Sequence, residues 1–129
     1  MFRAVKLSHL RPNNLFLSER KVRSIQDVWK NGKPEMLPPI LVTEIEGELS
    51  LIDGHSRAFV AWENGAASIR CEFSPLESIE GNPSVYKKIR SLALAQGIRT
   101  IGDLDQKILP DSEYRERWIR FCEGLNSTD

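Results

Sequence analysis

The sequence predicts an α+β fold, a small mixed sheet with helices followed by a C-terminal helical part. Up to residue 74, short segments that alternate apolar and polar residues are interleaved with segments of helical period. After the proline-bearing stretch from Ser74 to Pro83, the segments have helical periodicity. We therefore divide the chain into an α+β domain, residues 1–74, and a C-terminal helical extension, residues 75–129, that packs on it.

The first part is expected to follow the order β-α-β-β-α-β. Its strands are expected at residues 3–8, 40–45, 48–53 and 68–74, and the 40–45 and 48–53 strands are expected to form a hairpin around the turn at Glu46-Gly47. The first helix, residues 19–30, follows Ser18, a preferred N-cap residue. The second helix runs from a glycine turn at Asp53-Gly54 to about Asn64, and its apolar sequence predicts burial, including that of Trp62. Residues 9–14 are expected to form a loop, because the proline within them disfavours helix.

Three helices are expected in the second part. The first covers residues 84–96, the second begins at Thr100 with Asp103 in a capping-box position, and the third begins at Pro110. The first two superficially resemble a helix-turn-helix. Asp103 and Asp105 would repel DNA phosphate from the second of them. We expect these helices to pack on the α+β core or to form a dimer surface.

Composition narrows the class of protein. The 129 residues include 18 basic and 18 acidic side chains, so the formal net charge is zero and DNA binding through the phosphate backbone gains no support. No apolar run is long enough for a membrane span, and no signal peptide is recognisable, so we expect a cytoplasmic protein with no membrane partner. The two cysteines, Cys71 and Cys122, are expected to be buried free thiols.

The candidate site lies where the 48–53 strand meets the second helix. The sequence there is Asp53-Gly54-His55-Ser56-Arg57. A helix N-terminus presents unpaired N–H groups and partial positive charge, and arginine grips phosphate with a fork of donors. We therefore predict a phosphate- or nucleotide-binding site formed by Gly54, His55, Ser56 and Arg57.

The residues of this motif also have structural interpretations. Ser56, in the first turn of the helix, either donates to phosphate or is simply solvated. Asp53 is a preferred helix cap, and Gly54 is a typical tight-turn residue. Arg57 has two possible ion-pair partners, Asp53 and Glu19. His55 is a base, a phosphate donor or a surface residue. With only two histidines in the chain and no third ligand at suitable spacing, no metal site is predicted.

Residues 1–74 resemble the ParB/sulfiredoxin-like superfamily. The resemblance rests on the 19–30 helix and on Leu10-Arg11-Pro12, Pro38-Pro39-Ile40-Leu41-Val42, Leu51-Ile52-Asp53-Gly54-His55-Ser56-Arg57-Ala58 and Asn64-Gly65. Within the superfamily, the central motif is most similar to the Asp-Gly-His-Thr-Arg version of the free-serine kinases. The resemblance implies an N-terminal domain of the partition-protein type and a nucleotide ligand.

The chain departs from the superfamily patterns at specific positions. His55 stands where sulfiredoxins have their reactive cysteine, so that redox chemistry has no nucleophile here. Ser56 replaces the second arginine of the partition-protein signature. Asn14 occupies the place where the serine kinases have a catalytic glutamate, and Glu19 is the nearest acid.

Together these features predict a nucleotide- or phosphate-binding protein that acts as a small-molecule phosphotransferase or a nucleotide hydrolase. The ligand would be ATP, ADP or CTP with Mg²⁺, and Asp53, His55 and Glu19 are the candidate catalytic residues. The alternative is a non-catalytic nucleic-acid-associated or protein-interaction module of the partition-protein type. DNA and a second copy of the chain remain possible partners.

Overall fold

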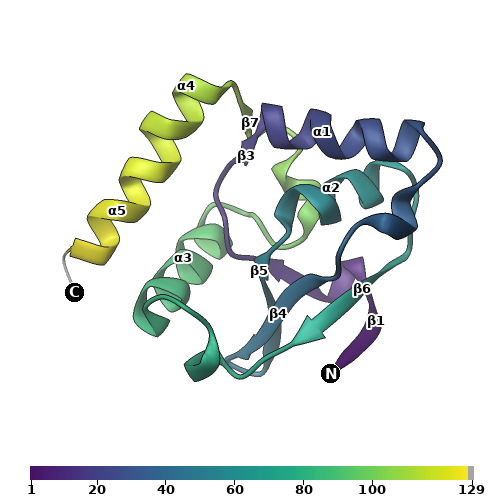
Figure 1. Ribbon diagram of the computed structural model, residues 1–129. Helices are drawn as coiled ribbons and strands as arrows, with labels where there is room; N and C mark the ends of the chain where they lie inside the picture. Colours follow the sequence, from purple (N-terminus) through teal and green to yellow (C-terminus); the bar gives the residue numbers. More distant parts are fainter. Residues whose placement is uncertain (128–129) are drawn as a thin grey trace.

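The computed structural model describes residues 1–127 and has a mixed five-stranded sheet at its centre (Figure 1). Across the sheet the strands are β1 (Phe2–Lys6), β6 (Ser68–Phe73), β4 (Ile40–Ile45), β5 (Glu48–Asp53) and β2 (Leu10–Pro12). The β1–β6 and β4–β5 pairs are antiparallel, whereas β4–β6 and β2–β5 are parallel. The predicted α+β class, the small mixed sheet and the hairpin are therefore confirmed.

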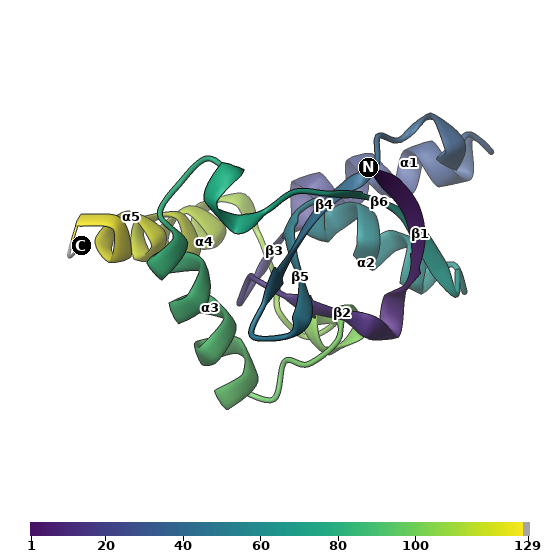
Figure 2. The same cartoon turned by 90° about the horizontal axis from the view of Figure 1, so that it is seen from below.

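Helices α1 (Glu19–Lys30) and α2 (His55–Glu63) pack against each other, and the sheet curves around α2 (Figure 2). Residues Ala58, Phe59 and Val60 of α2 have no exposed surface. The Ser18 hydroxyl accepts a hydrogen bond from the Lys21 N–H, at 3.4 Å, and so caps α1 as predicted. Because α2 is enclosed, its N-terminus is held in place relative to the sheet.

The C-terminal part is helical, as expected, except for the two-residue strand β7 (Ile108–Leu109). It contains α3 (Pro83–Ala95), the short helix η4 (Ile101–Leu104) and a final helix made of α4 (Asp111–Tyr114), η5 (Arg115–Ile119) and α5 (Arg120–Ser127). The segment η5 has π-helical geometry. Thr100 and Asp103 form the predicted capping box of η4. With four residues, η4 is too short to serve as a recognition helix.

Three short strands and three short helices were not expected. Strand β2 lies in the predicted 9–14 loop, where Pro12 is tolerated because β2 is at the edge of the sheet. Strands β3 (Leu17–Ser18) and β7 (Ile108–Leu109) form a separate parallel pair. The remaining single turns are η1 (Leu7–His9), η2 (Pro34–Met36) and η3 (Leu76–Ser78). Segments of two or three residues lack a detectable period, so pairing with distant residues determines them.

One hydrophobic core extends across the predicted boundary at residue 74. Phe59 of α2 shares it with Ala93 of α3, Leu104 of η4 and Trp118 of the final helix. The β3–β7 pair also joins the two parts. The helices after residue 74 therefore pack directly on the α+β part. The division of the chain into two domains stays a prediction.

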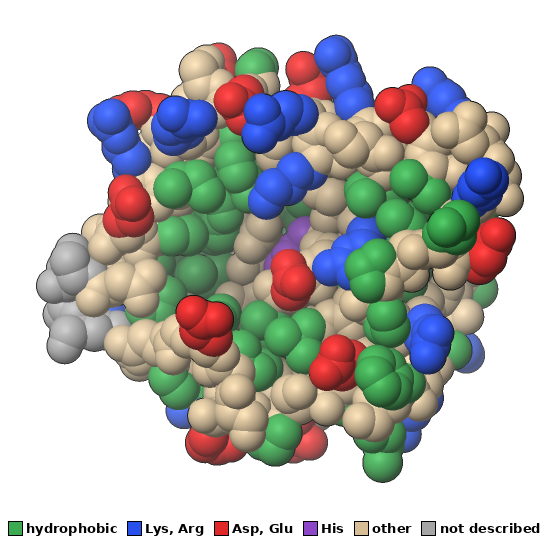
Figure 3. Space-filling view, in the orientation of Figure 1, with side chains coloured by type: hydrophobic (Ala, Val, Ile, Leu, Met, Phe, Trp, Pro, Cys, Tyr) green, Lys and Arg blue, Asp and Glu red, His purple; other side chains and the backbone are tan. Residues whose placement is uncertain are grey.

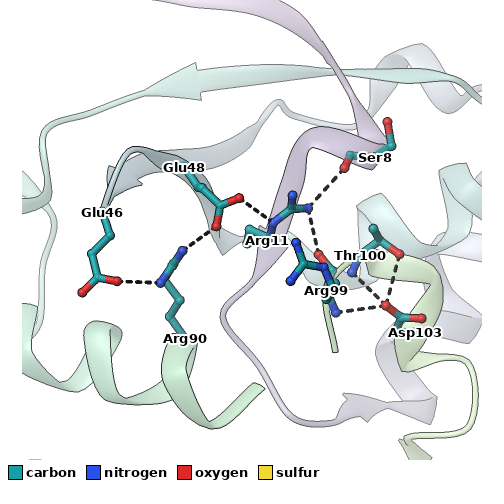
Figure 4. Close-up of polar contacts among 8 residues, drawn as sticks. All are labelled: Ser8, Arg11, Glu46, Glu48, Arg90, Arg99, Thr100 and Asp103. Atoms are coloured by element: carbon teal, nitrogen blue, oxygen red, sulfur yellow. Dashed lines mark hydrogen bonds and ion pairs between the residues drawn. The ribbon is translucent and has the colours of Figure 1, made fainter. Parts of the chain in front are cut away.

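An ion-pair network ties α3 to the β4–β5 hairpin (Figure 4). The Arg90 side chain, 7% exposed, donates to Glu46 Oε2 at 2.9 Å and also to Glu48 Oε1. Glu48 accepts a further bond from Arg11 Nε at 3.1 Å. Arg11 in turn donates to the main-chain oxygen of Arg99, at 3.1 Å. We call Arg11, Glu46, Glu48 and Arg90 the clasp, because they join β2, the hairpin and α3.

Of the two cysteines expected to be buried free thiols, both are free, but Cys71 is buried and Cys122 is only partly buried. Burial raises the pKa of the Cys71 thiol to about 11. Trp118 is also buried. Trp62, expected in the core, is 42% exposed, because its ring covers Gly102 of η4 from outside. Among the described residues, no helix has the length and apolarity that a membrane crossing requires.

Candidate functional site

A left-handed glycine forms the turn between β5 and α2. Gly54 has φ 105° and is the N-cap residue of α2, so Asp53 does not cap this helix. A Cβ atom at position 54 would lie 2.6 Å from Ile40 Cγ2, which excludes any larger residue without rearrangement. Within the described residues, no side chain caps α2. The first N–H groups of the helix are therefore free for a ligand.

Arg57 is held by the main chain beside this turn. Its Nη1 donates to the carbonyl oxygens of Pro38, at 2.8 Å, and Pro39, at 2.9 Å. Its Nη2 lies 3.4 Å from Asp53 Oδ2, so the ion pair expected as one alternative is present. The Asp53 carboxylate is 76% exposed, whereas the Arg57 side chain is 16% exposed. Arg57 therefore combines a structural role with a fixed position at the site.

His55 is buried, and its surroundings determine its protonation state. Its Nε2 accepts a hydrogen bond of 2.9 Å from the Asn13 N–H. Burial, together with the charge of Lys21, lowers the pKa of His55 to about 3. The imidazole is therefore neutral at physiological pH, and because Nε2 is an acceptor, the proton resides on Nδ1. No described residue accepts a hydrogen bond from Nδ1.

These groups line a cleft of about 380 Å³ between α1, the N-terminus of α2 and the final helix. Its walls are Asn14, Leu17, Ser18, Lys21, Ser24, Ile25, Ile52, Asp53, Gly54, His55, Ser56, Arg57, Tyr114 and Trp118. In Figure 3, hydrophobic side chains gather in a hollow beside the final helix, and polar and charged groups lie next to it. The structure thus brings Asp53, Gly54, His55, Ser56 and Arg57 together in one cleft.

Lys21 belongs to this site, although sequence reasoning did not single it out. It lies on α1, exposed, with Nζ 6.0 Å from the centre of the Tyr114 ring. The available signal was its spacing from Ser18 and Ile25, which places all three on one face of α1. Only the packing of α1 beside α2 shows that this face of α1 lines the same cleft as the Gly54 turn.

Glu19 does not join the cleft. Its carboxylate lies 3.4 Å from Arg23 on the exposed side of α1. Asp53 is therefore the acidic residue that the cleft lining contains. In the described part of the chain, no cluster of three or more His, Cys, Asp or Glu residues is arranged to hold a metal ion by itself. Catalytic roles for Asp53, His55 and Glu19 stay predictions.

The chain has a small α+β fold with a mixed sheet, which is the fold class that the sequence predicts. No family model matches the chain, and no curated protein matches it in sequence. Protein Atu1540 from Agrobacterium tumefaciens is structurally similar, with a TM-score of 0.56 and 19% identity over 81% of this chain. The match covers 61% of that protein's chain, and the likeness is one of fold.

Two further solved structures align at lower scores. Sulfiredoxin from Arabidopsis thaliana aligns with a TM-score of 0.47 and 21% identity, covering 69% of this chain and 96% of its own. The chromosome-partitioning protein ParB from Caulobacter crescentus, determined with the centromeric parS site, aligns with a TM-score of 0.42 and 15% identity. That alignment covers 87% of this chain and 67% of the ParB chain.

Proposed function

We propose that the chain binds a phosphate-bearing small molecule, with a nucleotide as the preferred ligand, in the cleft at the N-terminus of α2. The main support for this proposal is that several residues with hydrogen-bond donors line this one cleft. Gly54, His55 and Lys21 all line this cleft. No described side chain caps the N–H groups after Gly54, and the Nδ1–H of His55 has no described acceptor. Such donors favour a compact anion with several acceptor oxygens, and phosphate has that chemistry.

The size and remaining walls of the cleft also suit a nucleotide. A volume of about 380 Å³ lies within the range of small-molecule pockets, roughly 300–1,000 Å³. Ile25, Ile52 and Trp118 supply an apolar wall beside the polar groups. Mg²⁺ is commonly held by one or two carboxylates together with substrate phosphates, so Asp53 is the residue that would hold it beside a bound phosphate.

Phosphoryl transfer or nucleotide hydrolysis here would depend on Asp53. Positioning and charge neutralisation account for most of the catalysis of phosphoryl transfer, and the cleft supplies cations for both. His55 is a poor proton acceptor because its pKa is near 3 and its Nε2 is already bonded. Glu19 faces Arg23 instead of the cleft. We therefore assign His55 a binding role and Asp53 the role of metal ligand or base.

The test compares ligand binding in two charge-removing variants of the same helix. Isothermal titration calorimetry with ATP, ADP, CTP and GTP, each with Mg²⁺, measures affinity for the wild type, Lys21→Gln and Arg20→Gln. Lys21→Gln is expected to weaken nucleotide binding about tenfold, since a charged hydrogen bond contributes about 1.5–3 kcal/mol. Arg20 is exposed on α1 but does not line the cleft, so Arg20→Gln is expected to bind normally.

Release of inorganic phosphate in the same samples measures turnover, with Asp53→Asn as the inactive comparison. Binding without turnover would restrict the function to ligand binding. Failure of every nucleotide to bind, together with salt-sensitive retention of DNA, would overturn the proposal in favour of a nucleic-acid-associated module.

A further inference from the structure

A second, smaller cavity opens beside the proposed phosphate site. It has a volume of about 180 Å³ and lies between α3, the final helix and the β2–β3 segment. It shares Asn14, Ile52 and Trp118 with the larger cleft, so the two cavities have common walls. A ligand anchored at the N-terminus of α2 is therefore within reach of the smaller cavity.

The two cavities differ in charge. Lys21, Asp53 and Arg57 line the larger cleft. The smaller cavity is lined by Asn13, Asn14, Ile52, Gly81, Asn82, Val85, Tyr86, Ile89, Trp118, Cys122 and Asn126, none of which is charged at neutral pH. The neutral cavity is unsuited to a second phosphate. It suits an uncharged part of the same ligand.

Asparagines are concentrated in this cavity, which contains four of the six in the chain. Three of them have their amide nitrogen bonded to a main-chain carbonyl. Asn13 Nδ2 donates to Tyr86 O at 2.9 Å, Asn14 Nδ2 to Phe16 O at 3.3 Å and Asn126 Nδ2 to Cys122 O at 3.0 Å. A carbonyl oxygen only accepts, so these bonds determine which end of each amide is the nitrogen.

The amide oxygens are the groups left for a ligand. No described residue donates to Oδ1 of Asn13, Asn14 or Asn126 in the structure. The residues that line the cavity therefore combine amide oxygens without a described donor with apolar side chains such as Ile52 and Ile89 and the Trp118 ring. A flat heterocycle that carries an amino group matches this combination, because its faces are apolar and its edge donates hydrogen bonds. An aliphatic chain would leave the amide oxygens unpaired.

We propose that the smaller cavity is the base subsite of the nucleotide and selects bases with an exocyclic amino group over their oxo counterparts. This inference rests on the proposed function, because the phosphate at α2 places the base. It predicts that AMP binds more tightly than IMP and that CMP binds more tightly than UMP. Within each pair the ligands have nearly the same size, and the amino group is replaced by an oxygen.

The experiment measures dissociation constants by isothermal titration calorimetry for these four nucleotides, ribose 5-phosphate and inorganic phosphate. For the wild type we expect each amino-bearing nucleotide to bind at least tenfold more tightly than its oxo partner and than ribose 5-phosphate. Asn126→Ala is expected to lower the amino-over-oxo ratio about threefold or more. Cys122→Phe, which fills the cavity, is expected to reduce both nucleotides to the affinity of ribose 5-phosphate.

Glu123→Ala is the control, because Glu123 is exposed on the same helix and lines neither cavity. It should leave all affinities unchanged, and neither cavity variant should alter ribose 5-phosphate binding. Equal affinities within both nucleotide pairs, or ribose 5-phosphate binding as tightly as AMP and CMP, would overturn the base subsite while leaving phosphate binding intact. If no phosphate compound binds at all, the proposed function itself fails.

Discussion

At the scale of single residues, His55 shows how its environment determines what a side chain can do. A solvent-exposed histidine titrates near neutral pH and often serves as a base. Here burial and Lys21 keep the ring neutral, and the Asn13 N–H occupies one nitrogen. What remains is a single fixed N–H donor. The motif predicted a functional histidine, and the structure defines the kind of hydrogen bond it offers.

His55 is also expected to make the protein sensitive to acid. Its pKa is near 3 in the folded state and about 6.5 when unfolded, so the unfolded chain binds the proton first as pH falls. Stability is therefore full above pH 6.5 and declines below it, by up to about 1.4 kcal/mol per pH unit from this residue. Urea denaturation at pH 8.0 and pH 5.0 measures the loss.

The variant for comparison is His55→Gln, whose side-chain oxygen still accepts from the Asn13 N–H but does not titrate. We expect the wild type to lose about 2 kcal/mol more than His55→Gln over this pH interval. His9 is exposed, and His9→Gln should behave like the wild type. An equal loss in all three proteins would contradict the assignment of a buried neutral His55.

At the scale of elements, the clasp determines where α3 lies relative to the sheet. Arg90 reaches from α3 to Glu46 and Glu48 of the β4–β5 hairpin. Desolvation raises the pKa of Glu48, but Arg11 and Arg90 outweigh it, so the net pKa is below the usual carboxylate value. This contribution to stability is present above the usual carboxylate pKa and is lost as pH falls through the lowered value.

Replacing Arg90 is expected to loosen α3 from the hairpin. Arg90→Met keeps an unbranched apolar stem but removes the guanidinium and both ion pairs, and we expect a loss of about 1–3 kcal/mol of unfolding free energy. This is less than for a fully buried pair, because Glu46 remains 68% exposed and can be hydrated. Chemical denaturation measures the change, with Lys87→Met on the exposed side of α3 as the control. A change below about 0.5 kcal/mol in Arg90→Met would show that packing alone positions α3.

At the scale of the whole molecule, the C-terminal helices complete the site as well as the core. The final helix contributes Tyr114 and Trp118 to the cleft, and Cys122 and Asn126 to the smaller cavity. Trp118 also packs edge-on against Phe16 of the first part, with ring centres 6.5 Å apart. The candidate site is therefore shared between residues on both sides of position 74.

Because residues on both sides of position 74 also form one hydrophobic core, the chain is expected to unfold in one step. Calorimetric and van't Hoff enthalpies of thermal unfolding should agree, and tryptophan fluorescence and far-ultraviolet circular dichroism should give one midpoint. Trp118 reports on the C-terminal part, and Trp29 and Trp62 report on the first part. Trp29→Phe/Trp62→Phe, which leaves Trp118 as the reporter, separates the two signals. Two distinct transitions would instead support two independently folding domains.

The sequence by itself determined the long elements and the main turn. The α1 and α3 helices, the β4–β5 hairpin and the Ser18 cap follow from periodicity and local hydrogen bonding, which act between residues close in the chain. The tight turn at Gly54 follows from its residue type, whereas its left-handed φ is seen only in the structure. Only the tertiary structure decided the short strands β2 and β7, the presence of Lys21 at the α2 N-terminus and the cluster of asparagines under the final helix. These features depend on contacts between residues distant in the chain, and such contacts leave no period or local motif in the sequence.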